Sequence, residues 1–408
     1  AEDGPWSQAD LASGRAWERQ SGWFDPKLRV DNSLLENIVA LLRVLCGAPG
    51  VTEDEARHAL AKAIFVSFLE QRGIVGDEYR QLHEVEPLLS LVSHANRGGL
   101  ERLFTRLRQD FNGDFLNPAT DAASEFWHLP SSALDALAEF LKRTDVDTGQ
   151  RSFWGYDFSE IPIELISGIY QTFLATKDQI APQRGLSGSG TKRPRSQREL
   201  GAFYTPRHLA VYIVEQAFAG VADPLDQTIF DGACGSGILL TTAYRHLLRV
   251  AEQHYGQPLT FEDRRDLLRT RIFGSDIDLD ACRLTAFSLY LALLSELEPP
   301  DLAGIQRRGG KLPNLIGTNL RAGAQDGDVF AAGSVAATRR RFSMVISNPP
   351  WREPDAGERT TYEPWLASLT RPPSLSYRQI AIAYTFRALE CLKPGGRIAL
   401  VLPVRLIV

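Results

Sequence analysis

The sequence predicts two regions of different fold class, an all-helical domain over residues 1–181 and an α/β domain with a parallel, doubly wound sheet over residues 200–408. In the first region, apolar residues recur at three- and four-residue steps, which is the spacing of amphipathic helices. In the second region, short apolar strands alternate with helical segments, as in parallel sheets. A stretch rich in glycine, serine and proline separates the two and marks the domain boundary.

The composition is that of a globular protein. Its 408 residues are 44% hydrophobic and 23% charged, enough to bury a large core in each of two domains. We find no apolar run of about 18 residues and no secretory signal, so the expected compartment is the cytoplasm, with no membrane contact. The four cysteines lack CxxC spacing, which argues against a bound metal or a disulfide framework. With a net charge of −5, any contact with nucleic acid has to come from local basic patches.

Helices are expected throughout the first region. The strongest periodic runs cover residues 34–45 and 60–69, and further helices are expected over 100–111, 132–141 and 163–174. No alternating strand pattern competes with them. We therefore assign residues 1–181 to an all-α domain.

The linker is expected over residues 182–199. Its first part, PQRGLSGSGTKRPRS, offers little to bury and should stay flexible. The basic cluster at residues 192–195 has two explanations, a contact with phosphate groups or a solvated linker that happens to be basic. The pattern favours neither.

Five strands are expected in the second region, with helices between them. Because open α/β sheets bind ligands at the carboxyl ends of their strands, the residues that follow these strands are the candidate site residues. The expected strands cover residues 228–230, 272–275, 315–317, 342–347 and 397–402.

A glycine-rich segment, IFDGACGSGI, spans the first strand end at residues 229–238. Glycines here let the backbone approach a ligand and expose amide groups at the start of the next helix, expected near Ile238. The spacing matches neither the GxGxxG pattern of dinucleotide-binding folds nor the GK[ST] ending of a phosphate-binding loop. A nicotinamide cofactor and ATP are therefore disfavoured.

An acidic residue, Asp276, ends the second strand. At the carboxyl edge, its carboxylate can accept hydrogen bonds from both hydroxyls of a ribose. The alternative is that Asp276 caps the following helix. Asp278 and Asp280 are better placed for that first helical turn.

The fourth strand ends abruptly in Asn348, Pro349, Pro350 and Trp351. The two prolines fix the backbone and make the loop rigid. The Asn348 side-chain oxygen and the Pro349 carbonyl can each accept a hydrogen bond from a planar amino group, and Trp351 offers an aromatic face for stacking. The alternative is a plain strand end followed by a turn. The glycine loop and the acidic strand end upstream make that alternative less favoured.

Together these segments resemble the gamma-type N6-adenine DNA methyltransferases, over about residues 198–408. The segment GAFYTP at residues 201–206 is similar to the GxFYTP segment of that family, and DGACGSG at residues 231–237 is similar to its DPACGSG loop, with Gly232 in place of proline. The resemblance implies a Rossmann-like, class I S-adenosylmethionine-dependent methyltransferase domain preceded by an all-α domain. It also implies double-stranded DNA as partner and S-adenosylmethionine as cofactor.

The resemblance gives a role to each candidate cofactor residue. Tyr204 and Thr205 would hold the methionine part of the cofactor, Asp276 its ribose, and Ile277 would pack on its adenine. The amino group and ring of that adenine would be contacted by Asn319 and Leu320. The glycine loop would contribute Asp231, Ala233, Gly235 and Gly237.

The resemblance implies that the tetrapeptide acts on N6 of an adenine flipped out of the duplex. This nitrogen is a poor nucleophile because its lone pair is delocalised into the ring. Hydrogen bonds to Asn348 and Pro349 would draw it toward tetrahedral geometry, and the flipped base would stack on Trp351. The expected activity is site-specific DNA (adenine-N6) methylation in a restriction-modification or BREX-like phage-defence system.

Further resemblances concern the two ends of the chain. FNG at residues 111–113 and IELISGIY at residues 163–170 are similar to segments ahead of the catalytic domain in large methyltransferases of such systems, although a helix cap and a helix core explain them equally well. Members of the family continue past the fifth strand into a target-recognition domain. We therefore expect a C-terminally incomplete catalytic domain, with other subunits of a defence complex as partners.

Two alternatives keep parts of this interpretation. Protein-glutamine N5-methyltransferases also use an Asn-Pro-Pro-aromatic motif on a planar nitrogen, but the segment at residues 203–206, the helical domain and Trp351 favour DNA. A non-catalytic DNA-binding subunit of a defence complex could retain the fold without turnover. The intact glycines, Asp276 and the complete tetrapeptide favour an enzyme.

Overall fold

The computed structural model describes residues 30–111, 126–144, 149, 156, 158, 205–295, 297, 311–334, 341–353, 356–370 and 380–403. Among these residues, no helix is both long and apolar enough to cross a membrane. The expected helix over 163–174 and the linker over 182–199 lie outside the described residues, as do most of the FNG segment and the whole of IELISGIY.

The first of two compact units is helical, and its described residues lie in 30–68, 86–100 and 126–158. Its helices pack through their apolar faces, with α3 and α6 both against α8. The buried Asn37 joins distant segments, because its Nδ2 donates to the Thr144 carbonyl and to the Tyr156 hydroxyl. The helices described before residue 145 are α3 (Val30–Gly47), α4 (Glu53–Gln71), α5 (Asp77–His83), α6 (Leu88–Ser93), α7 (Arg97–Phe111) and α8 (Ser131–Leu141), with the single turn η4 at Phe126–His128.

The four periodic runs that the structure describes all form helices, in α3, α4, α7 and α8, which confirms the expected helical region. The short α5 and α6 were not predicted, because six or seven residues hold too few turns for a periodic pattern. By contacts, α5 and the part of α7 from residue 101 belong to the second unit.

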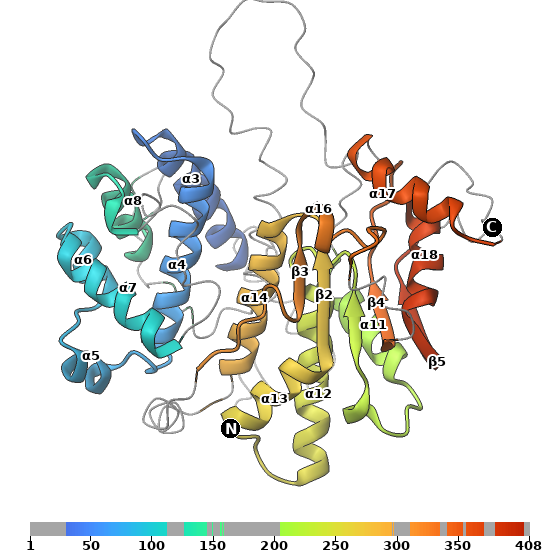
Figure 1. The fold of residues 1–408 in the computed structure, drawn as a ribbon. Coiled ribbons are helices and arrows are strands. Elements are labelled where there is room, and N and C mark those ends of the chain that lie inside the picture. Colours follow the sequence, from blue (N-terminus) through green and yellow to red (C-terminus); the bar gives the residue numbers. More distant parts are fainter. Residues whose placement is uncertain are drawn as a thin grey trace, which may run out of the picture. The chain divides into compact units, whose positions relative to one another are not determined.

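The second unit contains a five-stranded sheet in the order β3-β2-β1-β4-β5, and every neighbouring pair is parallel. This topology confirms the expected Rossmann-like α/β fold (Figure 1). The strands are β1 (Ile229–Asp231), β2 (Ile272–Asp276), β3 (Leu320–Ala322), β4 (Phe342–Ser347) and β5 (Leu392–Leu400).

The third strand was predicted in the wrong place. The apolar segment 315–317 precedes a turn in which Gly317 has φ +82°, and only Ile316 forms an isolated bridge, to Leu320. The strand itself starts at Leu320 and pairs with β2 from Gly274 onward. Because this turn lies between the apolar run and the strand, the run marks the approach to the sheet.

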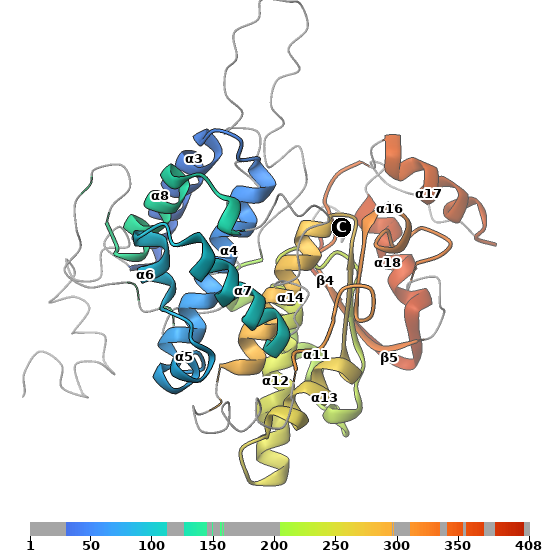
Figure 2. The same cartoon turned by 60° about the vertical axis from the view of Figure 1, so that its left-hand side comes forward.

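Helices cover the sheet in layers. On one side α11 and α14 both pack against α12, whereas α18 packs along β4 and β5 (Figures 1 and 2). Phe230 and Val345 bury their side chains in a core with residues of α17 and α18. The helices of this unit after residue 204 are α11 (Arg207–Phe218), η5 (Pro224–Asp226), α12 (Ile238–Tyr255), α13 (Phe261–Arg271), α14 (Leu279–Leu294), α16 (Gly323–Asp326), α17 (Ala356–Ala367) and α18 (Ile380–Cys391).

The strand order reverses between β1 and β4. The chain passes outward from β1 to β2 and β3, and then returns to place β4 on the other side of β1. In open α/β sheets such a switch point opens a crevice at the carboxyl ends of the strands. The last residues of β1 and β4, Asp231 and Ser347, stand there.

Candidate functional site

A hydrogen bond joins the ends of β1 and β4 at the switch point. Ser347 Oγ donates to Asp231 Oδ1 over 2.6 Å, and the Ala233 amide donates to the same oxygen over 3.1 Å. Both Asp231 and Ser347 are buried. The glycine loop and the tetrapeptide, which start immediately after these two residues, are therefore tied to a common point.

The glycine loop turns tightly into α12, which begins at Ile238 as expected. Gly237 has φ +78°, and a Cβ at this position would come within 2.8 Å of the Thr285 side chain. Only glycine combines this backbone conformation with this close approach. The Thr285 hydroxyl also donates to the Gly235 carbonyl, so α14 holds the loop from the side.

Asp276 is oriented by the loop. Its Oδ2 accepts from the Gly235 amide and its Oδ1 from the Asp278 amide, both over 2.9 Å. The cap of α14 is Asp278, whose side chain accepts from the Asp280 amide. Asp276 is therefore not the helix cap. Next to it, the side chain of Ile277 is 46% exposed at the carboxyl edge.

The two carboxylates of this edge share one electrostatic property. Burial raises the pKa of Asp231 to about 7, against the opposing hydrogen bond from Ser347. Burial also raises the pKa of Asp276 to about 6, against the opposing hydrogen bonds from backbone amides. Carboxylates with such pKa values are sensitive to any donor or positive charge brought to the edge.

Gly232, where the resembling family has proline, faces a buried tyrosine. A Cβ at Gly232 would collide with the Tyr384 hydroxyl and would lie 2.6 Å from Val329 Cγ1. The structure fills the space beside this glycine with the hydroxyl of Tyr384 on α18. Tyr384 is 3% exposed, and burial raises its pKa, as does the nearby Asp231.

Asn348 is held by the segment that precedes α11. Its Nδ2 donates to Thr205 Oγ1 over 3.0 Å, and Thr205 is buried. This contact spans 143 residues and fixes the orientation of the amide. Pro349 is buried and Pro350 partly so, which leaves the backbone of the tetrapeptide little freedom.

Trp351 is fixed at its indole nitrogen. Nε1 donates to the Val401 carbonyl over 3.1 Å, just beyond the end of β5. The next residue, Arg352, makes a two-pronged ion pair with Glu358 of α17, with both N–O distances 2.6 Å. The loop after β4 is thus anchored on both the strand and the helix that flank it.

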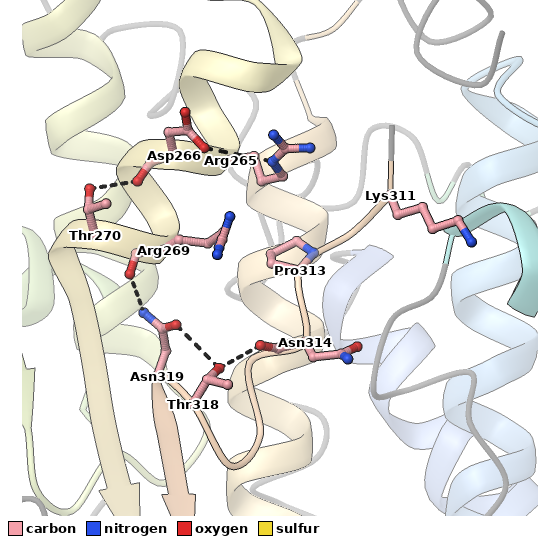
Figure 3. Close-up of a pocket in the computed structure, with 9 residues that line it drawn as sticks. All are labelled: Arg265, Asp266, Arg269, Thr270, Lys311, Pro313, Asn314, Thr318 and Asn319. Atoms are coloured by element: carbon pink, nitrogen blue, oxygen red, sulfur yellow. Dashed lines mark hydrogen bonds and ion pairs between the residues drawn. The ribbon is translucent and has the colours of Figure 1, made fainter. Parts of the chain in front are cut away.

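Asn319 and Leu320 do not lie with the other predicted cofactor residues, and their assignment needs correction. Asn319 precedes β3 and is therefore at the amino edge of the sheet, where its Nδ2 donates to the carbonyls of Arg269 and Ile272 over 2.9 and 2.7 Å (Figure 3). Leu320 is fully buried in the strand. The residue of β3 that pairs with Asp276 is Ala322.

The error has a physical cause. With the third strand placed at 315–317, Asn319 would have followed it at the carboxyl edge. The segment that reaches Asp276 instead includes Gly327, because a Cβ there would overlap the Asp276 carbonyl. Sequence reasoning also missed Ser347 and Tyr384, whose roles depend on tertiary contacts. Tyr204 lies outside the described residues.

The structure brings the other predicted residues to one edge of the sheet. Backbone amides from the glycine loop, one buried and one partly buried carboxylate, an exposed apolar side chain and the fixed amide of Asn348 meet around the switch point. Such a set can hold a ribose and an apolar ring, and can accept hydrogen bonds from an amino group. The residues are Thr205, Asp231, Ala233, Gly235, Gly237, Asp276, Ile277, Asn348, Pro349, Pro350 and Trp351.

The sequence matches a known protein family. The family model of the N-6 DNA methylases matches residues 193–407. The type II restriction enzyme and methyltransferase RM.Eco57I of Escherichia coli is 25% identical over 283 residues, covering 62% of this chain and 28% of that protein. The type I restriction enzyme MjaIX methylase subunit of Methanocaldococcus jannaschii is 26% identical over 186 residues, covering 44% of this chain and 27% of that protein. The matches thus span little more than a quarter of each relative.

Solved structures also align with the chain. A type I restriction-modification methyltransferase subunit from Streptococcus thermophilus gives a TM-score of 0.46 at 17% identity, covering 92% of this chain and 75% of that one. The type IIG restriction endonuclease BpuSI gives a TM-score of 0.48 at 16% identity, covering 98% of this chain and 38% of that one.

Proposed function

Because the chain belongs to the N-6 DNA methylase family, we propose that its carboxyl-edge site transfers a methyl group from S-adenosylmethionine to N6 of an adenine flipped out of double-stranded DNA. The observation that carries this proposal is the position of Asn348. Its amide is fixed by Thr205 at the end of β4, beside the strand end that holds the glycine loop.

The residues around the glycine loop fit S-adenosylmethionine. Each oxygen of the Asp276 carboxylate accepts one of the two hydrogen bonds from Gly235 and Asp278 and has a second lone pair for a ribose hydroxyl. The exposed side chain of Ile277 offers the adenine ring of the cofactor an apolar surface. When bound, S-adenosylmethionine supplies a methyl group activated by a positively charged sulfonium, and the nearby carboxylates favour that charge.

Asn348 and Pro349 would act on the target nitrogen. Hydrogen bonds from the adenine amino group to the Asn348 side-chain oxygen and the Pro349 carbonyl concentrate the nitrogen lone pair. Thr205 holds the Asn348 amide through Nδ2, so the amide does not need to rotate when the base arrives. The indole of Trp351, held by Val401, is an ordered platform for the base.

The names of the relatives support a biological setting. Both curated relatives are named as restriction enzymes or their methylase subunits. We propose that this protein acts in a restriction-modification or related phage-defence system in the cytoplasm. Other subunits of that system would be its partners, and the choice of DNA sequence would rest with protein segments other than the site described.

The test is methyl transfer by the purified 408-residue chain. Labelled S-adenosylmethionine is mixed with unmethylated genomic DNA or with a bacterial protein extract, and the products are analysed by mass spectrometry. We expect N6-methyladenine in the DNA. Label in protein glutamine instead would identify a protein methyltransferase. A folded chain that binds no S-adenosylmethionine in calorimetry would be a non-catalytic subunit, and either result overturns the proposal.

A further inference from the structure

The amino edge of the sheet, opposite the site above, contains a polar pocket of about 710 Å³. Its walls are α13 and the segment 311–319, which leads into β3 (Figure 3). Strand β3 separates this pocket from the carboxyl edge, since Asn319 lines the pocket and Ala322 pairs with Asp276.

The pocket carries an excess of positive charge. Arg265, Arg269 and Lys311 line it, and among the lining residues that the structure describes the single carboxylate is Asp266. Arg265 is paired, at 2.9 Å from Glu262 and 3.8 Å from Asp266. Arg269 and Lys311 are exposed, and neither forms an ion pair with any residue that the structure describes. In a chain of net charge −5, this is a local exception.

The two arginines lie on the same face of α13. Arg265 and Arg269 are four residues apart, and both extend toward the segment that contains Pro313 (Figure 3). Glu262 and Asp266 offset the charge of Arg265. Arg269 and Lys311 are therefore the cations with which an anion between α13 and the opposite wall would pair.

The end of α13 would ordinarily oppose an anion, because the last carbonyls of a helix carry partial negative charge. Here Asn319 covers part of that helix end. Its Nδ2 donates to the Arg269 carbonyl over 2.9 Å and to the Leu268 carbonyl over 3.4 Å, and also to the carbonyl of Ile272 at the start of β2. The side chain that we had expected to bind the cofactor therefore covers two of the last carbonyls of α13, next to the cationic side chains of the pocket.

We propose that this amino-edge pocket binds phosphate groups, with Arg269 and Lys311 as the principal ligands and Arg265 as a supporting charge. Guanidinium and ammonium groups form strong, charge-assisted hydrogen bonds with phosphates. The phosphates come either from a DNA strand that passes the far edge of the sheet or from a free phosphorylated ligand. The pocket shares no residue with the methyl-transfer site at the carboxyl edge.

The experiment compares variants of the 408-residue chain with two probes, a fluorescein-labelled DNA duplex followed by anisotropy and inorganic tripolyphosphate followed by calorimetry. The variants are Arg269→Ala, Lys311→Ala and both together. The matched control is Arg249→Ala, an exposed arginine on α12 that does not line the pocket. Binding of S-adenosylmethionine, measured in parallel, reports on folding and on the carboxyl edge.

We expect the double variant to bind tripolyphosphate at least about tenfold more weakly, and the control to bind it normally. If a DNA strand fills the pocket, duplex affinity falls too, and the slope of log affinity against log salt decreases by about one for each lost cation. If the ligand is free, duplex binding is unchanged. Unaltered tripolyphosphate binding, or an equal loss in Arg249→Ala, would overturn the proposal, whatever the methylation assay shows.

Discussion

The two edges of the same sheet have charged groups of opposite sign, in different surroundings. At the carboxyl edge, Asp231 and Asp276 are held by backbone amides and a serine hydroxyl, and burial raises the pKa of each. At the amino edge, Arg269 and Lys311 are exposed and lack carboxylate partners among the described residues. The first arrangement is suited to a ligand with hydroxyl donors and positive charge, and the second to an anion.

The two edges also differ in how firmly their side chains are held in position. Side chains at the carboxyl edge are fixed by contacts across the chain, such as those from Asn348 to Thr205 and from Trp351 to Val401. The cations at the amino edge stand on long, flexible side chains, of which Lys311 offers phosphate a point charge and Arg269 a planar, two-pronged donor. Substitutions should therefore affect chemistry at one edge and general affinity at the other.

The largest effect is expected for Asn348→Ala. Loss of an acceptor that acts on the target nitrogen should lower the rate of methyl transfer by about a hundredfold or more, by analogy with the loss of one fixed hydrogen bond in other active sites. Affinity for S-adenosylmethionine should stay within about twofold. Single-turnover kinetics and calorimetry measure the two quantities. Gln257→Ala, an exposed amide in the turn after α12, is the control. A parallel loss of cofactor affinity would contradict the role given to Asn348.

Asp276→Ala should act on the cofactor first. Without this carboxylate the ribose loses its acceptors, and we expect affinity for S-adenosylmethionine to fall about tenfold or more. Its neighbour Asp278 is a matched control, because it caps α14. Asp278→Ala should cost about 1 kcal/mol of stability and change affinity far less. If calorimetry and urea denaturation show lost affinity for Asp278→Ala and lost stability for Asp276→Ala, then Asp278 binds the ribose and Asp276 caps the helix.

The raised pKa of Asp276, about 6, gives cofactor binding a pH dependence. Ribose hydroxyls and the sulfonium favour the charged carboxylate, so affinity should rise with pH and be about tenfold weaker at pH 5 than near neutrality. The stability of the ligand-free protein should change with pH in the opposite direction. Because the folded pKa values of Asp276 and Asp231 exceed the ordinary 3.8, stability should fall as the pH rises from about 4 to about 7. Calorimetry and urea denaturation across this range test both signs, and an Asp276→Asn variant that keeps the binding profile would refute the assignment.

The smallest effect concerns packing under the glycine loop. Gly232→Ala should destabilise the protein by about 1–3 kcal/mol, because the new methyl group meets Tyr384 and Val329. Tyr384→Phe in the same chain should recover part of that loss by removing the hydroxyl. Gly333→Ala is the control, since nothing lies within 4 Å of its Cβ position. If the double variant is no more stable than Gly232→Ala in urea denaturation, the Tyr384 hydroxyl is not what excludes a methyl group at position 232.

Much of the carboxyl edge could be predicted from the sequence because its residues follow strands directly. The strand at 342–347 matches β4, and Asp276 and the tetrapeptide then take their places from strand direction alone. Asn319 was placed wrongly because an apolar run before a turn was taken for the strand itself. An error of five residues in the start of a strand moved a side chain from one edge of the sheet to the other.

Other features could not be predicted because they exist only between distant segments. Ser347 is an ordinary strand residue until β4 lies beside β1, and Tyr384 is an ordinary helical aromatic until α18 brings its hydroxyl to Gly232. The amino-edge pocket likewise requires α13 and Lys311 to meet from positions about forty residues apart. Local periodicity contains no information about such pairs.

The hydrogen bond between Ser347 and Asp231 has a consequence for how such a protein can change over generations. Removing the hydroxyl leaves a buried carboxylate without one of its donors, and removing the carboxylate leaves a buried hydroxyl without its acceptor. Either single replacement is therefore worse than the starting pair. Selection should therefore act on Asp231 and Ser347 as a pair. These two residues, at the ends of β1 and β4, should change together among descendants of this sequence or not at all.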